Sequence, residues 1–260
     1  MNEEIIELTL WQLVAAYIFI VFLLIVVKIR QIPRDKEILI STFRMTIQLL
    51  LVGYVLIYLF EHPHPLLTLA VLVIMVGFAI QNIFKRVRGQ LNREMKVIIA
   101  ISMAVGSLVS LFYFNVIVIQ FSPWYDPRYF IPIAGMIIGN SMTGVTLGVQ
   151  TLVEGLRDQR ARVEAALMMG ATPKEATRKI VDQAFDAAIL PTINSMVGTG
   201  IVFLPGMMTG QILAGVDPLT AIEYQIAILL GVSGAVALTV IIFVQNGYKV
   251  FFNEEDQLRE

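Results

Sequence analysis

Cysteine is absent from this 260-residue chain, which excludes disulfides, thiolate metal sites and cysteine nucleophiles. Charged side chains are scarce, at 15% of residues, whereas an ordinary soluble domain has about 25%. The Gly-x-x-x-x-Gly-Lys-Ser/Thr sequence that cradles nucleotide phosphates is also missing, so this chain carries no ATPase site of that type. The net charge of −1 gives no support to nucleic-acid binding. These absences argue against a soluble enzyme.

Apolar side chains are abundant instead, at 57% of residues, and the mean hydropathy is +0.76. A helix needs about 20 apolar residues to cross a bilayer core that is about 30 Å thick. We find seven such stretches, at 8–27, 38–60, 66–84, 97–120, 130–152, 187–206 and 226–244. Because lipid cannot satisfy an open backbone, we expect an all-α polytopic membrane protein with about seven transmembrane helices. Residues 1–260 are expected to form a single transmembrane domain.

The connections between these stretches differ in charge. Alternate connections hold nearly all of their lysines and arginines, and the others hold one basic residue, Arg128. Since lysine and arginine gather on the cytoplasmic side, we expect the N-terminus outside and the C-terminus in the cytoplasm. The outer connection at 206–218 is too apolar for an ordinary loop, so we expect it to re-enter the membrane or to pack across the outer mouth.

The longest polar stretch, 155–186, lies on the expected cytoplasmic side, between the fifth and sixth spans. Gly170 is placed to end one helix and Thr172 to cap the next. Pro173 fits a first helical position, and Glu175 completes a Thr-x-x-Glu capping box. The pattern therefore predicts a helix, a sharp turn and a second helix.

This polar stretch has three interpretations. It is a solvated helical loop, a DNA-reading helix-turn-helix, or a docking element that transmits movement between a cytoplasmic partner and the spans on either side. A single module tethered between two membrane spans lacks the paired half-site geometry of DNA readers, which disfavours the second interpretation. The loop and the docking element both remain open on this pattern alone.

Several stretches resemble a known family. "EAALMMG" at 164–170 resembles the Glu-Ala-Ala loop of ABC-transporter permeases, which docks on the ATP-binding subunit. Together with "GNSMTGVTLG" at 139–148, "RVEAALMMGATPKEA" at 162–176 and "LPGMMTGQILAG" at 204–215, it resembles the Fet-type iron-export permeases of bacteria. Plant aluminium-tolerance ABC membrane subunits are similar to that family. The broad Glu-Ala-Ala pattern has Leu-Pro soon after its glycine, whereas here "ILP" stands at 189–191.

The resemblance implies a multi-pass permease subunit of the bacterial inner membrane that exports iron or another metal. It implies a homodimer driven by a separate ABC ATP-binding subunit, which would carry ATP and magnesium, so this chain would be no enzyme and would hold no cofactor. The residues assigned to coupling are Arg162, Glu164, Ala165, Ala166, Gly170 and Thr172. The alternative is an ion-gradient-driven secondary transporter of a small polar solute, which needs no ATPase.

Polar side chains are concentrated in the fifth and sixth spans. Amides and hydroxyls there are suited to lining a pathway for a cation or polar solute, or to hydrogen bonding between helices. The residues assigned to the pathway are Asn140, Thr143, Gln150, Asn194, Thr199, Met207, Met208 and Gln211.

The only histidines of the chain lie in "EHPHP" at the outer mouth. Glu61, His62 and His64 offer one carboxylate and two imidazoles, which are ligands of transition metals. The alternative is a tight turn between the second and third spans, since prolines alternate with the histidines. The metal, if one is held, stays unknown.

Overall fold

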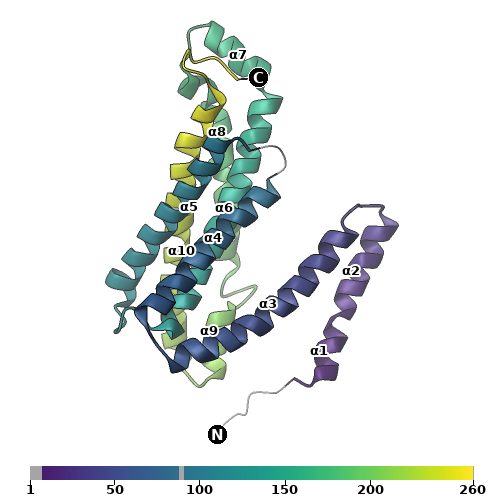
Figure 1. Cartoon of the computed structure of the whole chain (residues 1–260), viewed down its shortest axis with the longest axis vertical. Helices are drawn as coiled ribbons and strands as arrows, with labels where there is room; N and C mark the ends of the chain where they lie inside the picture. Colours follow the sequence, from purple (N-terminus) through teal and green to yellow (C-terminus); the bar gives the residue numbers. More distant parts are fainter. Residues whose placement is uncertain (1–7, 88–90, 260) are drawn as a thin grey trace. The chain divides into compact units, whose positions relative to one another are not determined.

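The computed structural model describes residues 8–87 and 91–259 (Figure 1). Within these ranges helices dominate and no strand occurs, which confirms the all-α fold. The contacts divide the chain into two compact units, Met1–His62 and Pro63–Glu260. The two units are described separately below, and the expected single domain stays a prediction.

The first unit is a helical hairpin. Its helices are α1 (Leu10–Ala16), α2 (Ile18–Ile29) and α3 (Asp35–Glu61). The hydroxyls of Tyr17, between α1 and α2, and Thr46 on α3 share a hydrogen bond across the pair. Nearly all of the large apolar side chains of this hairpin are exposed, as expected of helices that face lipid.

The second unit is a helical bundle. Its long helices are α4 (Pro65–Arg86), α5 (Arg93–Tyr113), α6 (Pro127–Asp158), α8 (Pro173–Gly198) and α10 (Pro218–Gly247). The short elements are the π-helix η1 (Phe114–Ile119), α7 (Arg160–Met168), α9 (Gly206–Leu213) and the 3-10 helix η2 (Tyr248–Phe251).

The helix starts follow local sequence signals. Four helices of the bundle begin with proline, whose fixed φ suits a first turn that has no hydrogen-bond partner for its N–H. Asn92 caps α5 by accepting a hydrogen bond from the Met95 N–H at 2.8 Å. Asp217 caps α10 in the same way, with the N–H groups of Leu219 and Thr220 as donors. These caps satisfy backbone groups that the helices leave unpaired.

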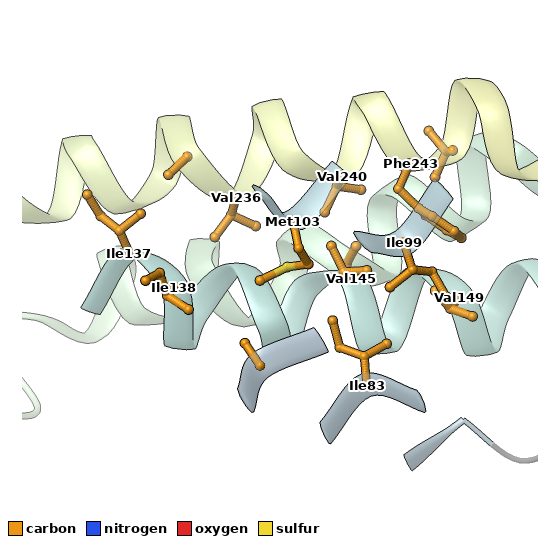
Figure 2. Packing of buried hydrophobic residues seen from close by; sticks show 14 of the residues in the cluster. Ile83, Ile99, Met103, Ile137, Ile138, Val145, Val149, Val236, Val240 and Phe243 are labelled. Carbon is orange, nitrogen blue, oxygen red and sulfur yellow. The ribbon is translucent and has the colours of Figure 1, made fainter. Parts of the chain in front are cut away.

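The core of the bundle lies around α6, which packs against α4, α5, α8 and α10. Figure 2 shows Val145 and Val149 of α6 between Ile83, Ile99 and other apolar side chains. Opposite them, Phe243 of α10 is fully buried. In lipid this close packing, rather than the exclusion of water, holds helices together.

Gly106 lies where α5 packs closely against α10. A methyl group on Gly106 would lie 2.6 Å from the Cα of Thr239 and 2.8 Å from its Cβ. We expect Gly106→Ala to destabilise the bundle by about 1–3 kcal/mol, because overpacking forces the helices apart. Thermal unfolding in detergent measures this effect. Gly77→Ala is the matched control, since no atom lies within 4 Å of the added carbon. A melting temperature of Gly106→Ala at or above that of the unaltered protein would contradict the prediction.

Six helical segments within the described ranges are long and apolar enough to cross a membrane, in agreement with the expected polytopic fold. The exception among the seven expected spans is the sixth, at 187–206. It forms no helix of its own, because α8 runs from Pro173 to Gly198 without interruption. The second helix of the polar stretch and the sixth span are therefore one helix. Its charged first turns explain why it is less apolar than the others.

The outer connection expected at 206–218 contains α9, which packs against the start of α10 (Figure 1). Met208 is its buried residue, with 7% of its surface exposed. The helix pairs about half of its backbone groups internally, which lowers the cost of placing so apolar a connection against the bundle.

Candidate functional site

A row of polar side chains runs along an exposed face of α6. Asn140, Thr143 and Glu154 are exposed, and spacings of three and eleven residues keep them on one side of the helix. The Asn140 Nδ2 donates to the Met136 carbonyl at 2.7 Å, and the Thr143 hydroxyl donates to the Gly139 carbonyl at 3.1 Å. Both side chains therefore keep unused accepting capacity toward the outside of the helix.

Glycines bring α8 close to α6. A Cβ on Gly144 would lie 3.2 Å from the carbonyl oxygen of Ala188, and one on Gly148 would lie 3.6 Å from that of Ala184. The later residue on α6, Gly148, faces the earlier residue on α8, Ala184, so the two helices are antiparallel (Figure 1). The Gly144 and Gly148 pair therefore serves packing within the chain rather than an interface between two copies.

The polar residues of α8 lie on the same side of this helix pair. In an antiparallel pair, residues one position before the contact residues project from the same side of both helices, about 100° round each helix. Thr143 precedes Gly144 and Gln183 precedes Ala184, so the two share a side. Asn194 follows Gln183 by eleven residues, about three turns, and continues the row. We call Asn140, Thr143, Gln183 and Asn194 the polar face.

Asn140, Thr143 and Asn194 of the polar face lie level with the middle of α6, a helix long and apolar enough to cross a membrane. Asn140 is near the middle of the 32-residue helix α6, and the register of α6 against α8 places Asn194 at its level. An amide left in hydrocarbon without a partner costs several kcal/mol, so polar groups inside a membrane normally meet a water-filled cavity or another protein surface. The polar face is therefore the most promising pathway lining in the bundle.

Gln150 lies two turns beyond Thr143 on the same side of α6, but it is half-buried and its Nε2 donates to the Arg86 carbonyl of α4 at 3.2 Å. The other residues expected along the pathway lie elsewhere. Thr199 follows the last residue of α8, and its hydroxyl donates to the Ser195 carbonyl at 2.6 Å. The three remaining residues, Met207, Met208 and Gln211, belong to α9. Of the residues expected along the pathway, the structure therefore places Asn140, Thr143 and Asn194 together on an exposed side, with the half-buried Gln150 on the same side of α6.

The histidines at the outer mouth have structural partners. The His64 Nδ1 accepts a hydrogen bond from the Leu66 N–H at 3.2 Å and so caps α4. The His62 ring stacks on Tyr58, with 4.9 Å between ring centroids. Across residues 8–87 and 91–259, no group of three or more His, Cys, Asp or Glu side chains is placed to hold a metal ion. The structure gives no support to a site made by Glu61, His62 and His64.

The polar stretch forms the expected helix, turn and helix. α7 ends at Met168, and Gly170 follows with a φ of +92°, a conformation that favours glycine. Met168 and Met169 project from this turn with 83% of each residue exposed. Val163 on the other side of α7 is fully buried. α7 is thus anchored on one side and presents two thioether side chains at its end.

The second helix starts with the predicted capping box. The Glu175 N–H donates to the Thr172 hydroxyl at 3.3 Å, and the Thr172 N–H donates to the Glu175 carboxylate at 2.9 Å. The hydrogen bond from the Thr172 backbone, with help from its hydroxyl, lowers the pKa of Glu175 below its usual value. Because the folded pKa is lowered, the contribution to stability is present above the usual pKa and is lost as the pH falls through the folded value.

The remaining coupling residues lie on α7. The carboxylate of Glu164 is 2.8 Å from the Arg160 Nε, so this glutamate pairs within its own helix. Arg162 and Ala165 are exposed, and Ala166 is half-buried. This ion pair fixes the direction of the Glu164 side chain, which the Glu-Ala-Ala motif alone does not predict.

The segment after the last helix makes contacts that the sequence did not predict. We call Glu94, Arg160, Phe252 and Arg259, which form these contacts, the clamp. Phe252 is buried, and beyond it the Arg259 guanidinium lies 3.2 Å from the Glu94 carboxylate of α5. The Arg259 carbonyl accepts a hydrogen bond from the Arg160 Nη1 at 3.4 Å. The segment after η2 therefore ties the start of α7 to the start of α5. The Phe-Phe pair after the last span was the one signal in the sequence.

Comparison with known proteins identifies the family. A model of the uncharacterised protein family UPF0014 matches residues 10–252. The chain belongs to this family. Among its relatives, the "Probable iron export permease protein FetB" of Escherichia coli is 34% identical over 246 residues, which cover 95% of this chain and 93% of that protein.

Two further relatives extend the comparison beyond one organism. The "UPF0014 membrane protein YjkA" of Bacillus subtilis is 34% identical, with 94% of this chain and 95% of that protein covered. "Protein ALUMINUM SENSITIVE 3" of Arabidopsis thaliana is 31% identical, with 94% and 88% covered. No solved structure matches the chain. The resemblance to iron-export permeases and to plant aluminium-tolerance subunits is confirmed, and this UPF0014 member is a multi-span membrane protein related to permeases.

Proposed function

We propose that this chain is the membrane subunit of an ABC transporter that exports iron or another metal and is driven by a separate ATP-binding subunit. The polar face supports the proposal, because Asn140, Thr143 and Asn194 are exposed on one side of α6 and α8 near the middle of α6, and Gln183 continues that side. Two copies that turn this face toward each other would line a pathway with amides and a hydroxyl. A relative named as an iron export permease supports the choice of substrate.

The proposed docking element is α7 and the turn after it. The exposed Met168 and Met169 stand at the end of a short helix whose other side is buried, and flexible methionines suit an apolar contact with a partner. On this proposal that end of the bundle faces the cytoplasm of a bacterial cell, because the basic connections lie there. ATP and magnesium would bind only to the partner subunit.

Reconstitution in liposomes tests the proposal. The chain is incorporated with and without its ATP-binding subunit, and movement of Fe²⁺ is followed with a trapped chelating dye. We expect transport that needs both proteins and ATP, and no transport when the phosphate-loop lysine of the ATP-binding subunit is replaced by alanine. Transport by this chain alone, driven by a proton or sodium gradient, would overturn the proposal in favour of a secondary transporter.

A further inference from the structure

A groove of about 680 Å³ runs between the start of α5 and the end of α10. These helix ends lie at the end of the bundle that carries α7 (Figure 1). Its walls are apolar and include Val97, Ile98 and Ile101 of α5, together with Ile242 of α10. Val97 and Ile101 are about half exposed, at 49% and 52%. The groove is therefore open along the side of the helix pair rather than enclosed within the bundle. In a membrane, such an opening faces the hydrocarbon chains.

Two cations stand at the end of this groove. Arg93 is the first residue of α5, and Lys249 lies in η2, two residues after the end of α10. The carboxylate of Glu94, which also lines the groove, is 3.2 Å from the Arg259 guanidinium, so its charge is balanced from outside the groove. The positive end of the α5 dipole and the negative end of the α10 dipole lie at this same end and offset each other, so Arg93 and Lys249 set its charge. The groove thus has an apolar length and a positively charged end.

We propose that this groove binds one anionic glycerophospholipid of the leaflet on the α7 side. Its phosphate would lie between Arg93 and Lys249, and an acyl chain would lie along Val97, Ile98 and Ile101. Basic pockets between transmembrane helices on the cytoplasmic side are suited to anionic headgroups, because each lysine or arginine near the surface contributes about 1 kcal/mol. The proposal depends on the chain spanning the membrane and does not depend on an ATP-driven mechanism.

The groove lies beside the clamp, which predicts a role for a lipid bound there. Glu94 and Arg259 border the groove and belong to the clamp that reaches Arg160 of α7. A lipid phosphate at Arg93 would therefore occupy the start of the helix to which the clamp is tied. We infer that the lipid stabilises the clamp and so the position of α7.

The test is native mass spectrometry of the purified protein after removal of lipid with detergent. Phosphatidylglycerol, phosphatidylcholine and soluble glycerol 3-phosphate are added separately. We expect one tightly bound phosphatidylglycerol, with weaker binding of phosphatidylcholine and none of glycerol 3-phosphate. Arg93→Gln with Lys249→Gln should weaken phosphatidylglycerol binding roughly 30-fold, since two basic groups contribute about 2 kcal/mol together. Lys85→Gln with Arg86→Gln, at the same end of α4, should change it less than threefold.

A second variant separates the acyl-chain groove from the charges. Ile101→Trp fills the groove and leaves both cations in place, so it should also lower retention of phosphatidylglycerol at least tenfold. Ile74→Trp on the exposed side of α4 is its control and should have no effect. Equal binding of glycerol 3-phosphate would overturn the proposal in favour of a free phosphate site. If Ile101→Trp changes the oligomeric state but leaves lipid retention unchanged, the groove holds another protein surface and the proposal is wrong.

Discussion

Replacing Met168 and Met169 together with aspartate should abolish ATP-driven transport while leaving the fold of the permease intact. Each methionine is 83% exposed, so the change removes no packing from the chain itself. Burying a methionine in a partner contributes about 1.5–3 kcal/mol, and two buried carboxylates without partners would add a large penalty. We therefore expect the ATP-binding subunit to bind at least about 100-fold more weakly, since each 1.4 kcal/mol is a factor of ten.

Binding is measured by co-purification and by titration of the ATP-binding subunit, together with its ATPase rate. Met168→Leu with Met169→Leu is the matched control, because leucine conserves the apolar volume and should bind nearly as well as methionine. Circular dichroism and the melting temperature show whether the aspartate variant is folded. An aspartate variant that binds and stimulates the ATPase as well as the unaltered protein would show that this turn does not dock.

Replacing Asn140 and Asn194 with leucine should stop transport without disturbing assembly. Both side chains are exposed at membrane depth on the polar face. If that face lines the pathway, leucine removes the groups that replace water around the substrate, and the loss of about 1.4 kcal/mol per contact is a factor of ten in rate. The expected transport rate is about 100-fold lower for the double variant, with the melting temperature unchanged or higher because leucine is the better transmembrane residue.

The control for this experiment is Ser110→Leu. Ser110 lies half-buried on α5 and lines a second groove between α5 and α10, which contains no residue of the polar face. The same polar-to-apolar change there should leave the transport rate within about twofold of normal. Binding of the ATP-binding subunit is measured in parallel and should be unchanged in both variants. Normal transport by the double leucine variant would mean that the polar face meets lipid or a partner surface, and the proposed pathway would be wrong.

Local signals predicted the docking element well. The cap of Thr172, its reciprocal contact with Glu175 and the positive φ of Gly170 all depend on residues within five positions of one another. Neighbouring residues decide such turns almost regardless of the rest of the fold. The same reasoning explains why proline is the first residue of four bundle helices.

Contacts over long sequence distances were harder to predict. The clamp joins Arg259 to Glu94 across 165 residues, and no local pattern indicates that pair. Gln183 was assigned to the polar stretch rather than to the pathway, because the sequence does not show that α8 continues unbroken through it. Only the register of α8 against α6 places Gln183 and Asn194 on the same side as Asn140. The members of the polar face were therefore found only in part.

Because α8 is one continuous helix, a movement of its capped start also moves the residues at its far end. From the capped start beside the exposed methionines to Asn194, the helix rises about 1.5 Å per residue, or about 30 Å in all. A tilt of about 10° at the capped start would then displace Asn194 by about 5 Å if the helix moves as a rigid rod. Pro191 lies three residues before Asn194 and removes one backbone hydrogen bond, so Asn194 stands just beyond the point at which α8 bends most easily. A small rotation at the capped start of this helix would therefore become a displacement of about 5 Å near Pro191 and Asn194.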